Sequence, residues 1–205
     1  TVRLLVEQGA DINQPGYRGR TPLMAALRFG RNDTARWLLD RGADPGLATA
    51  GGSPVAMMGS SLARPDPDLL NRLLPNDATA AGRGPNALIA AATGGQIEVI
   101  RALLDRSAPV DASDAQAETA LHKASRRGSA GVVRLLLEHG ASTGIRNARG
   151  ETPLAVLWSG SGDRAACLDA LLAHGADPRA CDRDGLFASE LAAILDGVFG
   201  SGRTT

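Results

Sequence analysis

An internal repetition with a period close to 33 residues constrains the fold of this 205-residue chain more than any other feature. One five-residue string recurs: a small residue, any residue, then Ser, Thr or Asn, then Pro or Ala, then an apolar residue. Its copies begin at residues 19, 51, 84, 117 and 150, with a degraded copy at 185, so the intervals are 32, 33, 33, 33 and 35 residues. A regular period of this length indicates a stack of similar structural units.

A second string begins 19 residues after the start of the first in three units and 21 residues after it in the fourth, which has a two-residue insertion. It reads Leu-Leu, two further residues, Gly and Ala. It spans residues 38–43, 136–141 and 171–176, and a variant with Ser in the place of Gly spans 103–108. Two linked strings with one period exclude a chance match.

Each unit is predicted to hold two short helices, as the second copy illustrates. Thr21-Pro22 starts the first helix, because a Thr hydroxyl accepts an orphan helix amide and Pro has no amide to lose. Gly30 ends that helix. The second helix covers residues 33–41 and ends at Gly42, a residue suited to the left-handed conformation that follows many helices. Such a pair buries its apolar face only when units stack.

The two strings resemble the ankyrin repeat. The copy nearest the family pattern reads Thr119-Ala120-Leu121-His122-x-Ala124 and then Leu136-Leu137-x-x-Gly140-Ala141. The resemblance extends from about Val2 to about Leu195. It implies an all-α ankyrin-repeat solenoid, in which helix-turn-helix units are joined by short β-turn or extended segments.

On this resemblance we expect a single ankyrin-repeat domain over residues 1–200 and a flexible tail over 201–205. The expected divisions are a partial repeat (1–14), four repeats (15–47, 81–113, 114–146 and 147–181), a degenerate repeat with an insertion (48–80) and a C-terminal cap (182–200). Because the chain starts inside a second helix, we expect a further repeat before it. In the degenerate repeat, Asp66-Pro67 is predicted to open the second helix, because Pro is excluded from a helix interior.

Composition and charge argue against several classes of function. The 22 basic residues balance the 22 acidic ones and only 3% of residues are aromatic, which disfavours nucleic-acid binding. No apolar run approaches the roughly 18 residues of a membrane span. A strong preference for Arg over Lys and many Ala residues favour a bacterial source. The lack of a signal-peptide pattern favours the cytoplasm, with an exported or periplasmic location as the alternative because Thr1 need not be the native start.

The cysteines and histidines of the sequence are explained by structural roles and do not require a catalytic or metal site. Two cysteines and three histidines are too few for a disulfide framework or a zinc module. Cys167 aligns with an inward apolar position, which favours a buried, inert thiol. The resemblance implies that His122 braces the neighbouring turn. His139 and His174 each precede a helix-ending Gly, where a cation favours the helix dipole. We therefore expect no catalysis, no cofactor and no metal site.

The resemblance implies a concave partner-binding face, formed by non-consensus positions on the turns and at the ends of the first helices. We expect these side chains to face solvent. The candidates are Tyr17, Arg18, Arg20, Arg28, Phe29, Arg83, Gln116, Glu118, Arg126, Arg127, Arg149, Glu151 and Trp158. Tyr17 and Phe29 are the expected anchor. Arginines outnumber acids on this face, so we expect a protein partner with an acidic surface; an ordinary solvated arginine face is the alternative.

The leading hypothesis is a non-catalytic module that binds a protein partner, in the manner of an adaptor, an effector or a toxin-neutralising protein. The alternative is a regulatory or targeting segment of a larger enzyme or transporter, and the start of the chain inside a helix supports it. Zero net charge and few aromatic residues disfavour a ligand-binding or nucleic-acid-binding role.

Overall fold

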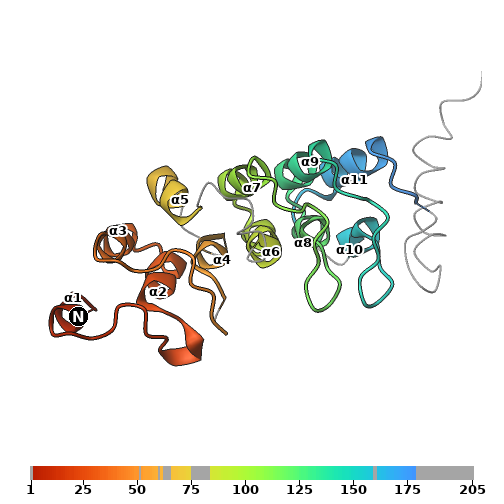
Figure 1. The fold of residues 1–205 in the computed structure, drawn as a ribbon. Helices are drawn as coiled ribbons and strands as arrows, with labels where there is room; N and C mark the ends of the chain where they lie inside the picture. The colour runs from red at the N-terminus through yellow and green to blue at the C-terminus, as the bar shows by residue number, and fades with distance from the viewer. Residues whose placement is uncertain are drawn as a thin grey trace, which may run out of the picture. The chain divides into compact units, whose positions relative to one another are not determined.

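The computed structural model describes residues 2–50, 52–59, 61, 66–74, 84–158 and 161–178. The chain forms two compact units, Thr1–Val110 and Asp111–Thr205, and each is described by itself. The described residues contain helices, turns and two isolated β-bridges but no strand (Figure 1). The prediction of a helical fold is therefore confirmed for this part of the chain.

Unit 1 contains seven described α-helices and one 3-10 turn. They are α1 (Val2–Glu7), η1 (Tyr17–Gly19), α2 (Pro22–Arg28), α3 (Asn32–Asp40), α4 (Pro54–Gly59), α5 (Pro67–Leu73), α6 (Gly84–Gly94) and α7 (Ile97–Leu104). Helix α2 packs on α3 and α4, α4 packs on α6, and α6 packs on α7. First helices of successive repeats therefore contact one another, and each also contacts the second helix of its own repeat.

Unit 2 has the same arrangement in its described residues. Its helices are α8 (Ala120–Arg127), α9 (Ala130–Glu138), α10 (Pro153–Trp158) and α11 (Arg164–Ala173). The first helices α8 and α10 pack side by side, as do the second helices α9 and α11, and each first helix also packs on its own second helix (Figure 1). Leucines at the centre of these contacts, such as Leu121, Leu136 and Leu171, are fully buried.

Helix starts and ends follow the predicted residues. Thr21 Oγ1 accepts a hydrogen bond from Met24 N at 3.3 Å, and Thr152 Oγ1 accepts one from Ala155 N at 3.3 Å. Gly42 follows α3 with φ of 88°, a left-handed conformation that a residue with Cβ adopts only at a cost. The predicted second helix at residues 33–41 corresponds to α3 within one residue at each end.

The degenerate repeat starts its second helix where the sequence predicts. Asp66 Oδ1 accepts hydrogen bonds from Asp68 N at 3.0 Å and from Leu69 N at 3.3 Å, and Pro67 is the first residue of α5. The limits expected for each repeat stay predictions. The C-terminal cap at 182–200, the tail at 201–205 and Arg83 lie outside the described residues.

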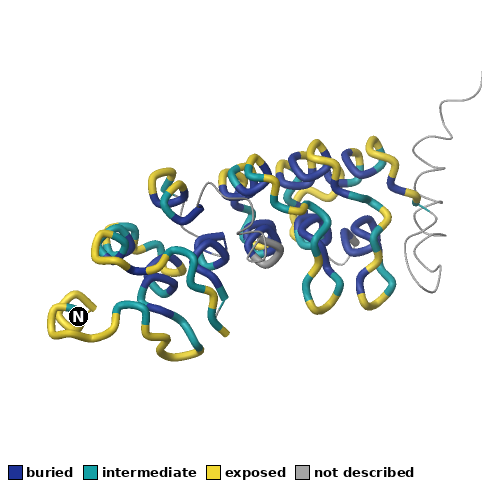
Figure 2. The backbone as a smooth tube through the Cα atoms, viewed as in Figure 1, coloured by how far each residue is buried: buried dark blue, intermediate teal, exposed yellow. Residues whose placement is uncertain are grey.

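The first helix of the chain, α1, is less buried than the helices that follow it. Figure 2 shows that α1 is exposed, whereas α2 and α4 are largely buried. Leu5 of α1 is 54% exposed, although Leu38 and Leu136, at the same register position, are fully buried. A single second helix therefore buries little without a first helix packed on it.

Candidate partner-binding surfaces

Two turns with the same backbone geometry form the exposed edge of unit 2 (Figure 1). In the first turn Asp114 N donates to Glu118 O at 3.0 Å, and in the second Asn147 N donates to Glu151 O at 2.9 Å. The side chain that opens each turn also caps it: Asp114 Oδ1 accepts from Gln116 N at 2.9 Å, and Asn147 Oδ1 accepts from Arg149 N at 2.9 Å. An Asp or Asn side chain that bonds its own backbone two residues later is a common turn device.

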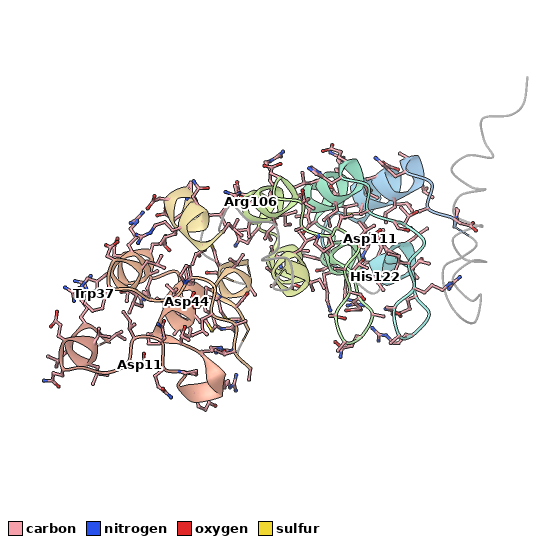
Figure 3. The ribbon with its side chains drawn as sticks, viewed as in Figure 1. Asp11, Trp37, Asp44, Arg106, Asp111 and His122 are labelled. Carbon is pink, nitrogen blue, oxygen red and sulfur yellow. The ribbon has the colours of Figure 1, made fainter. Side chains whose placement is uncertain are left out.

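The two turns are tied to each other. Ala148 N donates a backbone hydrogen bond to Gln116 O at 2.9 Å. Nearer to the helices, Asp111, labelled in Figure 3, accepts a hydrogen bond from Ser142 N at 2.9 Å through Oδ1. Side chains on this edge therefore stand on a backbone that is fixed across two successive repeats.

Glu118 lies at the centre of an ion-pair network, hereafter the Glu118 network, between the two turns and α8. Arg126 donates two hydrogen bonds to its carboxylate, one of them 3.0 Å long, and Lys123 donates a third. Asn147 Nδ2 lies 3.4 Å from Glu118 Oε1, and Arg149 Nη2 lies 4.0 Å from the same oxygen. The network joins residues of two repeats.

The remaining members balance the charge of the network. Lys123 Nζ lies 3.0 Å from Asp114 Oδ2. Arg149 Nε lies 3.0 Å from Glu151 Oε2. With Glu118 and Arg126, the network holds three carboxylates and three cations. It therefore adds no net charge to this edge of unit 2.

The surroundings of Glu118 shift its pKa strongly. Hydrogen bonds from Arg126 lower the pKa of Glu118 to about 2; burial acts in the opposite direction, and Lys123 adds to the lowering. Burial opposes the charged form of Lys123 too, yet its hydrogen bonds to Glu118 and Asp114 raise its pKa. Glu118 and Lys123 are therefore both charged at neutral pH.

His122 connects the start of α8 to the following turn (Figure 3). Its Nε2 lies 3.1 Å from Glu151 O, a carbonyl that can only accept, so Nε2 carries the proton. Its Nδ1 accepts from Thr119 N at 3.2 Å. Burial lowers the pKa of His122, which keeps the ring neutral. The prediction that His122 braces the neighbouring turn is confirmed.

The structure places the sequence candidates of unit 2 in different environments. Gln116, Arg127 and Arg149 are exposed, whereas Arg126 and Glu151 are partly buried. Glu118 is only 5% exposed, so the expectation that it faces solvent is wrong: three cations draw its carboxylate inward. Trp158 lies at the end of α10, and its side chain is outside the described part. The sequence analysis missed Asp114, Lys123 and Asn147, although Asp114 and Asn147 stand one 33-residue period apart.

In unit 1, one turn carries three of the candidates next to each other. Tyr17 is 83% exposed, and the Arg18 guanidinium lies 5.2 Å from the centroid of its ring. Gly16 N donates to Arg20 O at 2.8 Å, which closes the turn before α2. The expectation that Tyr17 faces solvent is confirmed.

Phe29 lies at the other end of α2. It is the C-cap residue of that helix and is 70% exposed. The seven residues of α2 make the helix about 10 Å long, so Tyr17 and Phe29 flank the helix and do not form one contiguous aromatic pair. A partner that contacts both side chains must span the length of α2.

Three arginines beside α2 form no ion pair with any residue that the structure describes. Among the described residues, no carboxylate lies within ion-pair distance of Arg18, Arg20 or Arg28, although other arginines of the unit have such partners. Arg20 Nε is buried without a hydrogen-bond partner. We call Tyr17, Arg18, Arg20, Arg28 and Phe29 the α2 surface; it carries uncompensated positive charge.

Ion pairs of unit 1 join neighbouring second helices. Arg72 Nη2 lies 2.9 Å from Asp40 Oδ1, and Arg41 Nη1 lies 3.9 Å from Glu7 Oε1. Two guanidinium groups lie over the ring of Trp37, labelled in Figure 3: the Arg3 group is 5.5 Å and the Arg41 group 4.5 Å from its centroid. The ion pairs found among the described residues of unit 1 therefore lie on second helices and their caps, and none lies on the α2 surface.

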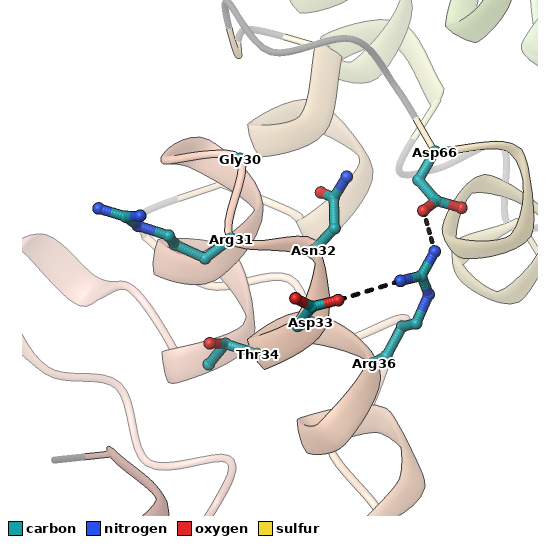
Figure 4. A pocket seen from close by; sticks show the side chains of 7 residues that line it. All are labelled: Gly30, Arg31, Asn32, Asp33, Thr34, Arg36 and Asp66. Atoms are coloured by element: carbon teal, nitrogen blue, oxygen red, sulfur yellow. Dashed lines mark hydrogen bonds and ion pairs between the residues drawn. The ribbon is translucent and has the colours of Figure 1, made fainter.

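A polar pocket of about 520 Å³ lies beside the start of α3 (Figure 4). Its lining is Gly30, Arg31, Asn32, Asp33, Thr34, Arg36 and Asp66. Arg36 Nη1 lies 3.3 Å from Asp33 Oδ1, and its other terminal nitrogen donates to Asp66. Arg36 thus links α3 to the first turn of α5, and its charge is used within the fold.

The cysteine and the two other histidines among the described residues are buried or hydrogen-bonded within their own helices. Cys167 is fully buried, and burial raises the pKa of its thiol, so the predicted buried thiol is confirmed. His139 Nδ1 donates to Leu135 O at 2.8 Å, and His174 Nδ1 donates to Ala170 O at 2.9 Å, the same bond at equivalent helix ends. Within the described ranges no His, Cys, Asp and Glu group could hold a metal ion, and no helix there is long and apolar enough to span a membrane.

Comparisons with known proteins agree on the fold. A family model described as "Ankyrin repeats (3 copies)" matches residues 1–49 and 57–147. The human ASB11 ankyrin repeat domain superposes with a TM-score of 0.72 at 23% sequence identity, and the match covers 92% of this chain and 84% of that domain. These matches confirm the all-α ankyrin-repeat architecture.

Two curated relatives match over a short stretch. The ADP-ribosylation factor GTPase-activating proteins AGD2 and AGD4 of Arabidopsis thaliana are 46% and 43% identical to this chain over 54 residues. Each match covers 26% of this chain and 7% of the relative. This chain therefore corresponds to a small part of those proteins.

Proposed function

Because the chain belongs to the ankyrin-repeat family, whose repeats are generally protein–protein interaction modules, we propose that it binds a protein partner through its α2 surface and the other candidate positions of the predicted concave face. The observation that carries this proposal is the combination of two highly exposed aromatic side chains with three arginines that lack carboxylate partners among the described residues. Tyr and Arg are frequent hot-spot residues, and a large exposed aromatic side chain gains most from burial in an interface.

The partner is proposed to present an acidic surface to the α2 surface. Positive charge on this surface increases the rate of encounter with an acidic protein and imposes an orientation on it. In unit 2, Gln116, Arg127 and Arg149 are proposed to add contacts, because they are exposed on the turn edge or at the end of α8. Glu118, Arg126 and Glu151 are proposed to support that edge through the Glu118 network. Arg83 and Trp158 are retained from the sequence prediction.

The module is proposed to act without catalysis, as an adaptor, an effector or a toxin-neutralising protein in the bacterial cytoplasm. The alternative is a regulatory or targeting segment of a larger enzyme or transporter. The two plant relatives give this alternative no particular support, because their similarity lies within repeats and covers 7% of their length.

A paired substitution tests the α2 surface. We expect the double variant Tyr17→Ala with Phe29→Ala to retain its melting temperature, since both side chains are largely exposed. We expect it to bind the captured partner at least tenfold more weakly, because loss of an aromatic hot spot costs about 2 kcal/mol or more. Surface plasmon resonance should assign the loss to faster dissociation.

The matched control is Ile97→Ala, which removes an exposed apolar side chain from the second helix α7. It should bind like wild type. If the aromatic double variant also binds like wild type, the partner contacts another surface and the site assignment is wrong. If wild type captures no protein from its native lysate under conditions in which it is folded, the proposed function itself fails.

A further inference from the structure

One turn position carries opposite charges in the two units. Arg20, Glu118 and Glu151 each stand directly before the residue that caps a first helix. The turns around Arg20 and Glu118 share their backbone bonds: Gly16 N to Arg20 O is 2.8 Å and Asp114 N to Glu118 O is 3.0 Å. The side chains therefore leave equivalent points of equivalent turns.

A second position repeats between the units without a change of charge. Arg28 stands seven residues after Thr21, the N-cap of α2, and Arg126 stands seven residues after Thr119, the N-cap of α8. In unit 2, the guanidinium at this position forms two hydrogen bonds with the carboxylate of Glu118. The two positions are therefore close enough for a bidentate ion pair.

Unit 1 has an arginine at both positions. Among the described residues, neither Arg20 nor Arg28 has a carboxylate within ion-pair distance. Nε of Arg20 is buried and has no acceptor, and a buried donor left without a partner is costly. Unit 1 thus repeats the cation of the Glu118 network and replaces its carboxylate with a second cation.

We propose that Arg20 and Arg28 form a receptor for a carboxylate side chain of an acidic partner segment, which supplies the charge that Glu118 supplies in unit 2. This inference rests on the proposed function and names the chemistry of the contact. Guanidinium groups bind carboxylates through paired, charge-assisted hydrogen bonds. We assign the bound group as a carboxylate, and not as a nucleic-acid phosphate, because in unit 2 the equivalent Arg126 is paired with the carboxylate of Glu118. Tyr17 and Arg18 flank the receptor on the same turn.

The substitution Arg20→Glu tests the receptor. The introduced carboxylate takes the position of Glu118 opposite Arg28, so the ion pair forms within the chain. We expect the melting temperature to stay at or above that of wild type. Affinity for a short glutamate-rich peptide, measured by fluorescence anisotropy at low salt, should fall at least about tenfold. The reverse variant Arg28→Glu should give the same two results.

The matched control is Arg101→Glu, which makes the same charge change at an exposed position of α7 in the same unit. Its affinity for the peptide should fall by less than about threefold, since a distant charge acts only through the screened field. In NMR spectra of the arginine Nε–H groups, the peptide should shift the Arg20 signal most. Equal loss in Arg20→Glu and Arg101→Glu, or an unshifted Arg20 signal, overturns the proposal.

Two further outcomes separate this inference from the proposed function. If a single-stranded oligonucleotide competes with the peptide at equal affinity, the receptor does not select carboxylates and the inference is wrong. If the captured protein partner binds Arg20→Glu like wild type but loses affinity for the aromatic double variant, protein binding by the α2 surface stands and the carboxylate receptor falls.

Discussion

Glu118 is a carboxylate that folding removes from water and surrounds with Arg126, Lys123 and Asn147. Transfer of a charge into a protein interior is costly unless hydrogen-bonded counter-charges accompany it. Here the counter-charges come from α8 and from the turn of the following repeat. Glu118 therefore couples two repeats through electrostatics as well as through apolar packing.

This coupling predicts a pH dependence of stability. The pKa of Glu118 falls from 4.5 to about 2 on folding, so its contribution is fully present above pH 4.5 and is lost as pH falls towards 2. The wild type should lose at most about 3 kcal/mol of unfolding free energy across this window through Glu118. Urea titrations at several pH values measure the loss, which should be much smaller in Glu118→Gln.

The control for this titration is Glu138→Gln, at an exposed position of α9. It should retain the wild-type pH profile. His122 adds a separate contribution, because its lowered pKa makes stability decline once pH falls below 6.5. An identical profile for Glu118→Gln and wild type below pH 4.5 would contradict the role assigned to the network.

The residues around Glu118 show which features of a site can be predicted from a single sequence. The helix start at Thr119 and the bracing role of His122 depend on residues close together in sequence or on the family pattern, and these predictions hold. The burial of Glu118 depends on Lys123 and Arg126, five and eight residues later, and on Asn147 in the next repeat. These side chains come together only when the repeats stack, and rules based on neighbouring residues in the sequence do not predict contacts between repeats.

At the scale of the helix, the close packing of α4 against α6 requires residues without a side chain at the contact. A Cβ added at Gly59, the last residue of α4, would lie 2.9 Å from Ala91 N of α6. Gly59 also carries a carbonyl that would lie 2.1 Å from a Cβ added at Gly94. These two glycines let the backbones of the helices approach each other closely.

Gly59→Ala should therefore push α4 away from α6. We expect a loss of about 1–3 kcal/mol of unfolding free energy, the usual cost of overpacking, measured by urea denaturation. The control is Gly144→Ala, at an exposed position where an added Cβ meets nothing within 4 Å; it should change stability by less than about 0.5 kcal/mol. Equal effects of the two substitutions would show that the contact is not tight in solution.

Helix starts were predictable because each depends on a few neighbouring residues. Asp66-Pro67 identified the start of α5 despite the insertion before it, since Pro is favoured in the first turn of a helix and excluded later. The close approach of α4 and α6 was not predicted. It depends on a glycine from each helix, and nothing in the sequence of one helix specifies the residue of the other that it contacts.

At the scale of the whole molecule, stability should vary along the chain. In stacked repeats each unit is stabilised mainly by its neighbours, so a repeat with an insertion and without the usual Gly-Ala return is a weak point. From the sequence we expect hydrogen exchange followed by mass spectrometry to show faster exchange in residues 59–68, of which 60 and 62–65 lie outside the described residues, than in residues 117–141. Equal protection of the two segments would contradict this expectation.

The turn before each first helix also bears on how the binding of such a chain can change over generations. Its backbone bonds are the same whether the position before the cap holds Arg20 or the buried Glu118, so the shape of the turn does not depend on the charge at this position. A change at this one codon can therefore replace a charge that is paired within the chain by a charge that a partner can bind, while the turn persists. Selection acting on this position, in nature or in a mutant library, can alter specificity without first having to rebuild a fold.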